Sequence, residues 1–360
     1  MTQGALPPWW STVVPALGVL AAGLGIAFEL DTALALASAG VLIATVFAAV
    51  HHAEVVAHRI GEPYGTLVLA VAVTVIEVAL IVSVMLSDPA AKSGLARDTV
   101  FAAVMIVCNG IVGLSLLAGG VRHFEQGFHQ QGASAALAVL AALTILTMIV
   151  PNVTVSAPGA QFSPAQLVFA GAVSLILYGS FVFVQTIRHR DYFLPVESHS
   201  DDAHAEPPSD SKALISLALL VVALAVVVWL AKLLTPHLEA GLNALAAPKG
   251  VAGIAIAAIV LLPEGLAALR AARANRLQTS LNLALGSALA SIGLTIPAVA
   301  AVALIFDFPL QLGLSMKDSV LLALTLVLGV VTLGTGRTTV LQGIVHLVVF
   351  AAFIFFALVP

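Results

Sequence analysis

Apolar residues along this chain run in long blocks that are separated by short polar segments. A helix needs about 20 consecutive apolar residues to cross a bilayer. By that rule the pattern predicts an all-α polytopic membrane protein with eleven transmembrane helices. The predicted spans are 11–29, 33–50, 65–86, 99–119, 133–151, 164–186, 212–234, 250–269, 280–305, 318–335 and 339–358.

One polar segment stands apart by its length: residues 188–212 read RHRDYFLPVESHSDDAHAEPPSDSK. Its Asp, Ser, Pro and His residues cannot bury a hydrophobic core. The segment divides the chain into an N-terminal segment with the first span (1–32), a five-helix block (33–187), a cytoplasmic linker (188–211) and a second five-helix block (212–360). Because five is odd, the second block enters the membrane inverted, as in the repeats of transporters that bind substrate near the midplane.

The composition agrees with this class of protein. Hydrophobic residues make up 61% of the chain, charged residues 9%, and the mean hydropathy is +1.11. Soluble domains do not have such values, whereas helical membrane proteins do. The single cysteine, Cys108, excludes an intramolecular disulfide. The opening MTQGALPPWW has no basic region or cleavage site, so we expect a retained N-terminus with Trp9 and Trp10 at the membrane interface.

The distribution of basic residues predicts the orientation, because cytoplasmic loops carry an excess of Lys and Arg. A cytoplasmic N-terminus places nine basic residues in cytoplasmic loops and five outside, which favours that choice. The cytoplasmic set is Arg59, Arg122, Arg188, Arg190, Lys212, Arg270, Arg273, Arg276 and Arg337. The external set is Lys92, Arg97, Lys232, Lys249 and Lys317.

Two carboxylic acids lie deep in apolar segments: Glu77 in VAVTVIEVALIVSVML and Glu264 in IAIAAIVLLPEGLAAL. A carboxylate in hydrocarbon is costly, and such residues usually face a water-filled cavity and carry ions or protons. Each acid is on the second span of its five-helix block. The pair therefore predicts one cation site shared by two related halves of the chain.

The sequence around the acids offers further oxygen ligands. Thr74 precedes Glu77 by three residues and shares its helical face. Pro263 removes the N–H that would bond the carbonyl of Ile259, and freed carbonyls of broken helices coordinate ions in transporters. The alternatives are a protonated Glu77 bonded to a neighbouring helix and a simple proline kink that leaves Glu264 near a helix end.

The third span of each block adds polar groups. Asn109 lies in the first block, and Ser287 and Ser291, spaced i and i+4, share a face in the second. Gly286 and Gly293 would permit close helix approach. Small-residue helix packing is the alternative for these positions, although an amide such as that of Asn109 is harder to hide in lipid.

Histidines form a second group of candidates, in HHAEVVAHRIGEP. Because histidine titrates near neutral pH, this segment could sense cytoplasmic pH or relay protons, and the alternative is a polar juxtamembrane loop. Its titratable residues are His51, His52, Glu54, His58 and Glu62.

Two other places carry titratable groups. His346 in the last span fits packing or proton relay equally. The linker either binds calcium weakly or is a solvated tether. The linker residues concerned are His199, Asp201, Asp202, His204 and Glu206.

Two stretches resemble the alpha-repeats of the calcium/cation antiporter superfamily: GEPYGTLVLAVAVTVIEVALIVS and LLPEGLAALRAARANRLQTSLNLALGSALASIGLTIP. The chain is identified as a member of the proton-coupled branch, and it is similar to the bacterial ChaA-type calcium/proton and sodium(potassium)/proton antiporters. The resemblance covers nearly the whole chain, and the second stretch is its most specific part. It implies a fold of one helix plus two five-helix repeats.

The family pattern in each repeat resembles GNxxE followed by a Gly-Ser helix. By position, Glu77 and Glu264 match the two essential acids, Gly286 and Ser287 match the Gly-Ser of the second repeat, and Asn109 matches the Asn of the first. The resemblance thus implies that these residues form the cation site.

The chain departs from this pattern before each acid, where the Gly-Asn pair is replaced by Val73-Thr74 and by Val260-Leu261. The first repeat also lacks its Gly-Ser. Fewer side-chain oxygens therefore surround the site than in calcium-selective relatives, which leaves sodium or potassium as alternatives to calcium.

The acids and the resemblance together predict a secondary active antiporter that exports Ca²⁺ in exchange for H⁺ by alternating access. Burial favours the protonated form of a carboxylic acid and a bound cation reverses this, so one site holds protons or metal but not both. Calcium takes about six to eight oxygens. Besides the two acids, we expect these to come from Thr74, Asn109, Ser287, Ser291, backbone carbonyls and water.

Other classes of function stay open or are excluded. Sodium(potassium)/proton exchange is the main alternative, and a passive cation channel would use the same acids without proton coupling. An enzyme is not expected, since the sequence has neither a nucleophile–base pair nor an HExxH metal motif. We expect no cofactor, no nucleic-acid partner and a bacterial inner-membrane location, and the oligomeric state stays open, a homo-oligomer included.

Overall fold

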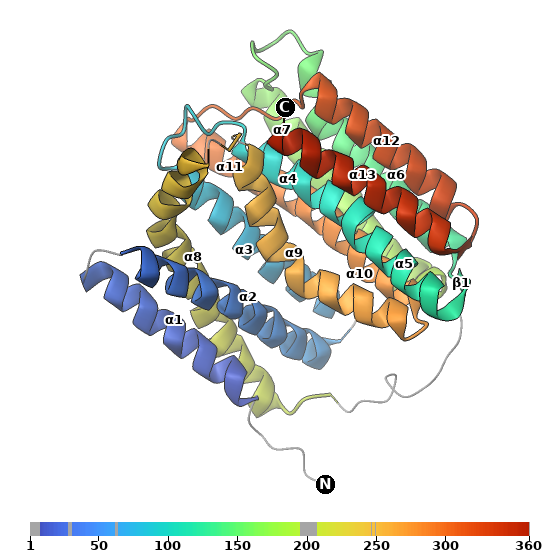
Figure 1. Ribbon diagram of the computed structural model, residues 1–360, viewed down its shortest axis with the longest axis horizontal. Coiled ribbons are helices and arrows are strands. Elements are labelled where there is room, and N and C mark those ends of the chain that lie inside the picture. The colour runs from blue at the N-terminus through green and yellow to red at the C-terminus, as the bar shows by residue number, and fades with distance from the viewer. Residues whose placement is uncertain are drawn as a thin grey trace. The chain divides into compact units, whose positions relative to one another are not determined.

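The computed structural model describes residues 8–27, 31–61, 64–194, 207–245, 247–248 and 250–359, and these are mostly helical (Figure 1). Among them, ten helices are long and apolar enough to cross a membrane, and Trp9–Gly25 adds a shorter apolar helix. The prediction of an all-α protein with about eleven spans is confirmed. The chain forms two compact units, Met1–Asp88 with His199–Ala247 and Pro89–Ser198 with Pro248–Pro360.

The described residues of the first unit form four helices. In it α2 packs against α1, α3 and α8, and Figure 1 shows α1, α2 and α8 side by side. Asp31 begins α2 by accepting a hydrogen bond from the Leu34 amide at 2.7 Å, and Gly61 ends it with a positive φ of 75°. The helices are α1 (Trp9–Ala27), α2 (Thr32–Ile60), α3 (Tyr64–Met85) and α8 (Asp210–Ala244).

Two of these helices extend well beyond the predicted spans. The prediction ended the second span at residue 50 and the seventh at residue 234, whereas α2 runs to Ile60 and α8 to Ala244. Polar residues interrupt the apolar run in α2, but one apolar face is enough to hold a helix against its neighbours. Ala53 and Val56 supply that face and are buried.

Polar contacts show which helix ends lie together in the first unit. The Nε of Arg59 donates to Oδ1 of Asp210 at 2.8 Å, which joins the end of α2 to the start of α8. Ser87, just after α3, donates to Oε1 of Glu239 near the end of α8 at 3.2 Å. The starts of α3 and α8 therefore lie at one end of this unit, together with the end of α2.

The second unit contains the other helices, several of which include π-helical turns. The π-helices η1 and η6 interrupt the third span of each sequence block. Single π turns occur often at functional sites. The elements are α4 (Leu95–Met105), η1 (Ile106–Ile111), α5 (Val112–His123), β1 (Gln126–Gly127), α6 (Gln130–Thr144), η2 (Ile145–Ile149), η3 (Val150–Asn152), α7 (Pro164–Phe183), η4 (Val184–Arg188), η5 (Arg190–Phe193), α9 (Gly250–Arg273), α10 (Leu277–Ala290), η6 (Ser291–Thr295), α11 (Ile296–Phe306), α12 (Met316–Leu333), β2 (Arg337–Thr338) and α13 (Val340–Leu358).

Glycines allow close helix contacts in this second unit. A Cβ on Gly253 of α9 would lie 2.8 Å from the backbone of Asp98 in α4, so only glycine lets these helices approach so closely. The short strands β1 and β2 pair antiparallel and bring the end of α5 to the start of α13. Figure 1 shows α5 and α13 running next to each other.

The compact units and the predicted sequence blocks divide the chain differently. The first spans of the two blocks, α2 and α8, pack on each other in one unit, although the 188–211 linker separates them in sequence. Residues 195–206 of that linker lie outside the described part of the chain.

Candidate functional site

Glu77 lies within the apolar helix α3 of the first unit. Its side chain is buried, with only 1% of its surface exposed. Helix α3 packs against α2 and α8 of the same unit. The sequence prediction of a carboxyl group deep in an apolar environment is met at Glu77.

Thr74 lies one turn before Glu77 and is also buried. Its Oγ1 donates a hydrogen bond to the carbonyl oxygen of Ala70 at 2.8 Å. A hydroxyl that donates its one proton to the backbone keeps two lone pairs on its oxygen. The Thr74 oxygen can therefore still act as a ligand or as a hydrogen-bond acceptor.

Glu264 lies in α9 of the second unit and is half-buried. Pro263 is inside this helix, which continues to Arg273, so the acid is not at a helix end. Because proline has no N–H, the carbonyl of Ile259 lacks its usual helical donor. The next residue, Gly265, packs against Ile111 of η1, whose Cδ1 lies 3.1 Å from the position of a Cβ.

Ser287 and Ser291 occupy the end of α10 and the first position of η6. Ser291 is buried and Ser287 half-buried. The two predicted glycines behave differently. Gly293 packs tightly on Tyr178, whose Cβ lies 2.7 Å from the position of a Cβ at Gly293, whereas a Cβ at Gly286 would meet no atom of another part of the chain within 4 Å. The expectation that Gly286 permits close helix approach is wrong.

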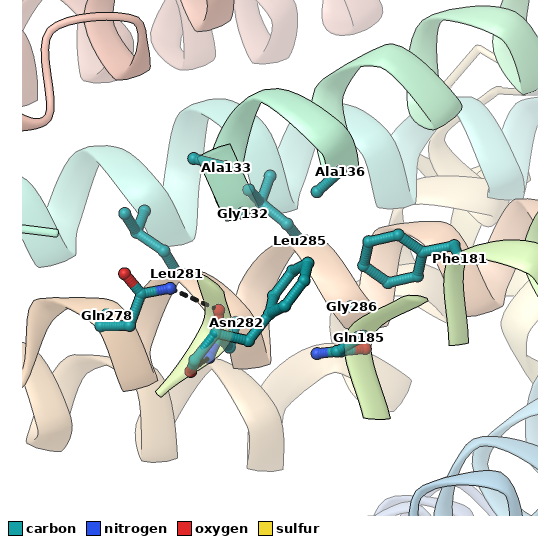
Figure 2. A pocket seen from close by; sticks show the side chains of 11 residues that line it. Gly132, Ala133, Ala136, Phe181, Gln185, Gln278, Leu281, Asn282, Leu285 and Gly286 are labelled. Carbon is teal, nitrogen blue, oxygen red and sulfur yellow. Dashed lines mark hydrogen bonds between the residues drawn. The ribbon is translucent and has the colours of Figure 1, made fainter. Parts of the chain in front are cut away.

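Gly286 instead borders a small pocket between α6, α7, η5 and α10, shown in Figure 2. Here Gln278 donates from Nε2 to Oδ1 of Asn282 at 2.8 Å, and Asn282 donates from Nδ2 to the carbonyl of Phe193 at 2.6 Å. The cavity has a volume of about 10 Å³, which is room for about one water molecule. Neither predicted acid lines it, so it is not a candidate cation site.

Asn109 belongs to η1 and is completely buried, and its amide is engaged on both sides. Nδ2 donates to Oγ1 of Thr325 at 2.8 Å, and Oδ1 lies 3.1 Å from Nδ1 of His346. The other ring nitrogen of His346 lies 3.1 Å from Oγ1 of Thr332. The Oδ1 of Asn109 has two lone pairs, so one of them stays available to a cation while the other accepts from His346.

The sequence did not reveal the threonine partners in this network. Thr325 and Thr332 are seven residues apart, which is two helical turns, so they lie on one face of α12. That spacing could have indicated a polar face on this helix. Only packing of η1, α12 and α13 shows that this face meets Asn109.

The histidine segment lies on the helix α2, so the alternative of a polar loop is wrong for residues 51–60. His52 is fully buried, and its Nε2 is 2.9 Å from the carbonyl oxygen of Ser11. The ring of His51 lies 5.2 Å from that of Trp10. These contacts join α2 to the start of α1.

The rest of the histidine segment faces away from that contact. Glu54 and His58, four residues apart on α2, are both exposed. Glu62 lies outside the described residues, as do the linker residues His199, Asp201, Asp202, His204 and Glu206. A role in pH sensing or proton relay stays a prediction.

Among the described residues, no three side chains of His, Cys, Asp or Glu come together to hold a metal ion. Glu77 belongs to one compact unit and Glu264 to the other. Each acid therefore has to be considered with the neutral oxygens of its own unit.

Comparison with known proteins gives the family. Residues 30–187 and 215–359 match the family described as sodium/calcium exchanger protein, on the two sides of the 188–211 linker. The protein y4hA of Sinorhizobium fredii, described as an ionic transporter, is 50% identical over 365 residues, which cover 99% of this chain and 98% of y4hA. The sodium-potassium/proton antiporter ChaA of Escherichia coli is 37% identical over 316 residues, which cover 87% of this chain and 85% of ChaA.

Solved structures give the fold. Native YfkE matches with a TM-score of 0.75 and 17% identity, over 97% of this chain and 100% of that chain. The H⁺/Ca²⁺ exchanger CAX matches with a TM-score of 0.68 and 12% identity, over 96% of this chain and 89% of that chain. These likenesses show a shared helical fold.

Proposed function

Because this chain belongs to the sodium/calcium exchanger protein family, we propose that it is a secondary active cation/proton antiporter that exports Ca²⁺ in exchange for H⁺. The observation that carries the proposal is Glu77, a carboxyl group with 1% of its surface exposed inside an apolar helix. Membrane proteins keep such groups for the transport of ions or protons. Membership of the family and the ten described helices long enough to cross a membrane support a multi-pass transporter.

In the proposed mechanism, Glu77 and Glu264 hold either the cation or protons. Burial favours the neutral form of a carboxylic acid, and a cation favours the charged form. Cation binding therefore releases protons, and proton binding releases the cation. Alternating access then couples the two fluxes. The apparent affinity for the cation should rise with pH, because fewer protons compete for the two acids.

The alternative is a Na⁺(K⁺)/H⁺ antiporter for monovalent-cation and alkaline-pH homeostasis. It is favoured by the 37% identity to the sodium-potassium/proton antiporter ChaA. It is also favoured by Val73-Thr74 and Val260-Leu261, which supply few side-chain oxygens before the acids. A passive cation channel would use the same acids but would not move protons. We place the protein in the bacterial inner membrane with its N-terminus in the cytoplasm.

The first test measures proton flux in inverted membrane vesicles with an acidic interior. Calcium, sodium and potassium are added in turn between about pH 7 and 9, where competition by protons falls. We expect micromolar calcium to dissipate the gradient. A response only to millimolar sodium or potassium would select the alternative, and no response to any cation would contradict antiport.

A second prediction concerns Thr74. Thr74→Val keeps the shape of the side chain but removes its oxygen, so we expect the KM for the cation to rise by roughly tenfold. The measurement is the cation dependence of proton flux. Thr186→Val is the matched control, because Thr186 is also buried and also donates to the carbonyl four residues earlier, at 2.7 Å. Equal KM values for the two variants would remove Thr74 from the site.

A further inference from the structure

We propose that His346 is a positioning residue for cation exchange, which acts through Asn109 to fix the π-helix η1 against α9 beside Glu264. The proposal rests on the function proposed above, and all of its contacts lie within the second compact unit. It assigns a role to a buried intramembrane histidine that the exchange mechanism itself does not use.

The hydrogen bonds around His346 have defined donors and acceptors. The Oδ1 of Asn109 can only accept, so Nδ1 of His346 must donate to it over 3.1 Å. A neutral imidazole has one donor and one acceptor, so its Nε2 accepts from Oγ1 of Thr332 over 3.1 Å. In its neutral form, the imidazole therefore carries its proton on Nδ1.

The chain of hydrogen bonds from donor to acceptor continues beyond Asn109. Its Nδ2 donates to Oγ1 of Thr325 at 2.8 Å, and Thr325 donates to the carbonyl of Leu321 at 2.8 Å. The side chains of His346, Asn109, Thr325 and Thr332 are all buried, with 5% or less of their surface exposed. Buried networks of this kind, when every member is satisfied, specify one arrangement of the surrounding helices.

Helix α13 holds η1 through packing as well. The ring of Phe350 lies 3.4 Å from the position of a Cβ on Gly110, and the Cβ of His346 lies 3.1 Å from that of a Cβ on Gly113, just after η1. The glycines therefore let η1 and α5 lie directly on α13. Single π turns are rare within helices, and these contacts help to hold η1 in register.

The other side of η1 meets the helix that carries the acid. The Cδ1 of Ile111 lies 3.1 Å from the position of a Cβ on Gly265, which follows Glu264. A change in the register of η1 would therefore displace Ile111 and shift α9 at Glu264. This path links His346 to the acid without any direct contact between them.

Two substitutions separate the two bonds of His346. His346→Asn retains a donor near the position of Nδ1, so it can keep the bond to Asn109 and loses the one to Thr332. His346→Gln reaches the position of Nε2, so it can keep the bond to Thr332 and loses the one to Asn109. Thr332→Val is a further control, because it leaves the bond to Asn109 in place.

We expect His346→Gln to raise the cation KM by about 10- to 100-fold with little change in the maximal rate, as for other residues that position metal ligands. His346→Asn and Thr332→Val should stay within about twofold of the wild type, since both keep the bond on which the positioning depends. The readout is proton flux in vesicles against cation concentration. Equal KM values in the Gln and Asn variants, or a loss of maximal rate alone, would overturn the proposal.

Cys108 gives a readout that does not depend on transport. It is the single cysteine of the chain, it lies in η1, and it is buried. Release of η1 should expose the thiol, so we expect N-ethylmaleimide to label His346→Gln roughly tenfold faster than His346→Asn or the wild type. Equal labelling rates in all three proteins would overturn the role of His346, whether or not a cation drives proton flux. Faster labelling of His346→Gln, together with no cation-driven flux in the wild type, would contradict only the proposed function.

Ile111→Val tests the same path if the His346 variants fail to fold. This change removes the Cδ1 atom that contacts Gly265 and leaves the hydrogen bonds of Asn109 intact. The cation KM should rise while the labelling of Cys108 stays at the wild-type rate. An unchanged KM would show that η1 does not support the position of Glu264.

Discussion

Glu77→Gln will abolish cation-driven proton flux, and Glu264→Gln will do the same in a separate variant. Glutamine has the size of glutamate, but it has no charge to bind a cation and it cannot take up or release a proton in exchange for one. Glu77 is buried within an apolar helix, where a neutral amide cannot balance the charge of a bound cation. The loss of one charged partner in a buried site corresponds to roughly a hundredfold or more in activity.

The measurement is the dissipation of an imposed proton gradient by calcium, sodium or potassium in inverted vesicles. The amount of each variant in the membrane and its elution as a single species would show that it folds. Glu125→Gln is the matched control, because Glu125 is exposed and its ion pair with Arg337, at 2.9 Å, contributes at most about 1 kcal/mol. Normal exchange by either acid variant would remove that acid from the mechanism.

The helical spans could be predicted from the sequence because they cross the hydrocarbon core of a bilayer. A segment that crosses hydrocarbon must satisfy every backbone group internally, so length and hydropathy alone select a helix. This logic fails where a helix leaves the apolar region. His51 and His52 ended the predicted second span, yet α2 continues to Ile60 because its buried face packs on neighbouring helices.

The site was predictable only in part, for a related reason. Burial of a lone acid can be read from its apolar neighbours in the sequence, and Glu77 meets that expectation. The partners of Asn109 could not be read in this way. Thr325, Thr332 and His346 are more than 200 residues away, and their contacts depend on how η1, α12 and α13 pack.

The pairing of helices could not be predicted from the sequence either. The linker divided the sequence into two five-helix blocks but did not show which helices pair, and the first spans of both blocks, α2 and α8, pack together. Asp210 at the start of α8 pairs with Arg59 near the end of α2, although neither residue reveals its partner by pattern.

Gly343→Val should strongly impair folding. A Cβ at Gly343 of α13 would lie 2.5 Å from the backbone nitrogen of Leu117 and 2.9 Å from the carbonyl oxygen of Gly113, both in α5. Backbone atoms cannot move aside as a flexible side chain can. The helices would have to separate, which would cost roughly 3 kcal/mol, at the upper end of the overpacking range. We expect a clearly lower melting temperature and little folded protein in the membrane.

Gly179→Val on α7 makes the same change where no atom lies within 4 Å, so it should fold like the wild type. The comparison separates the close approach of α5 and α13 from any general effect of valine in a helix. The separation of these helices also explains why exchange would fail along with folding, since α13 carries His346 and α5 continues from η1. If Gly343→Val melted at the same temperature as Gly179→Val, α13 could not lie as close to α5 as the backbone contact requires.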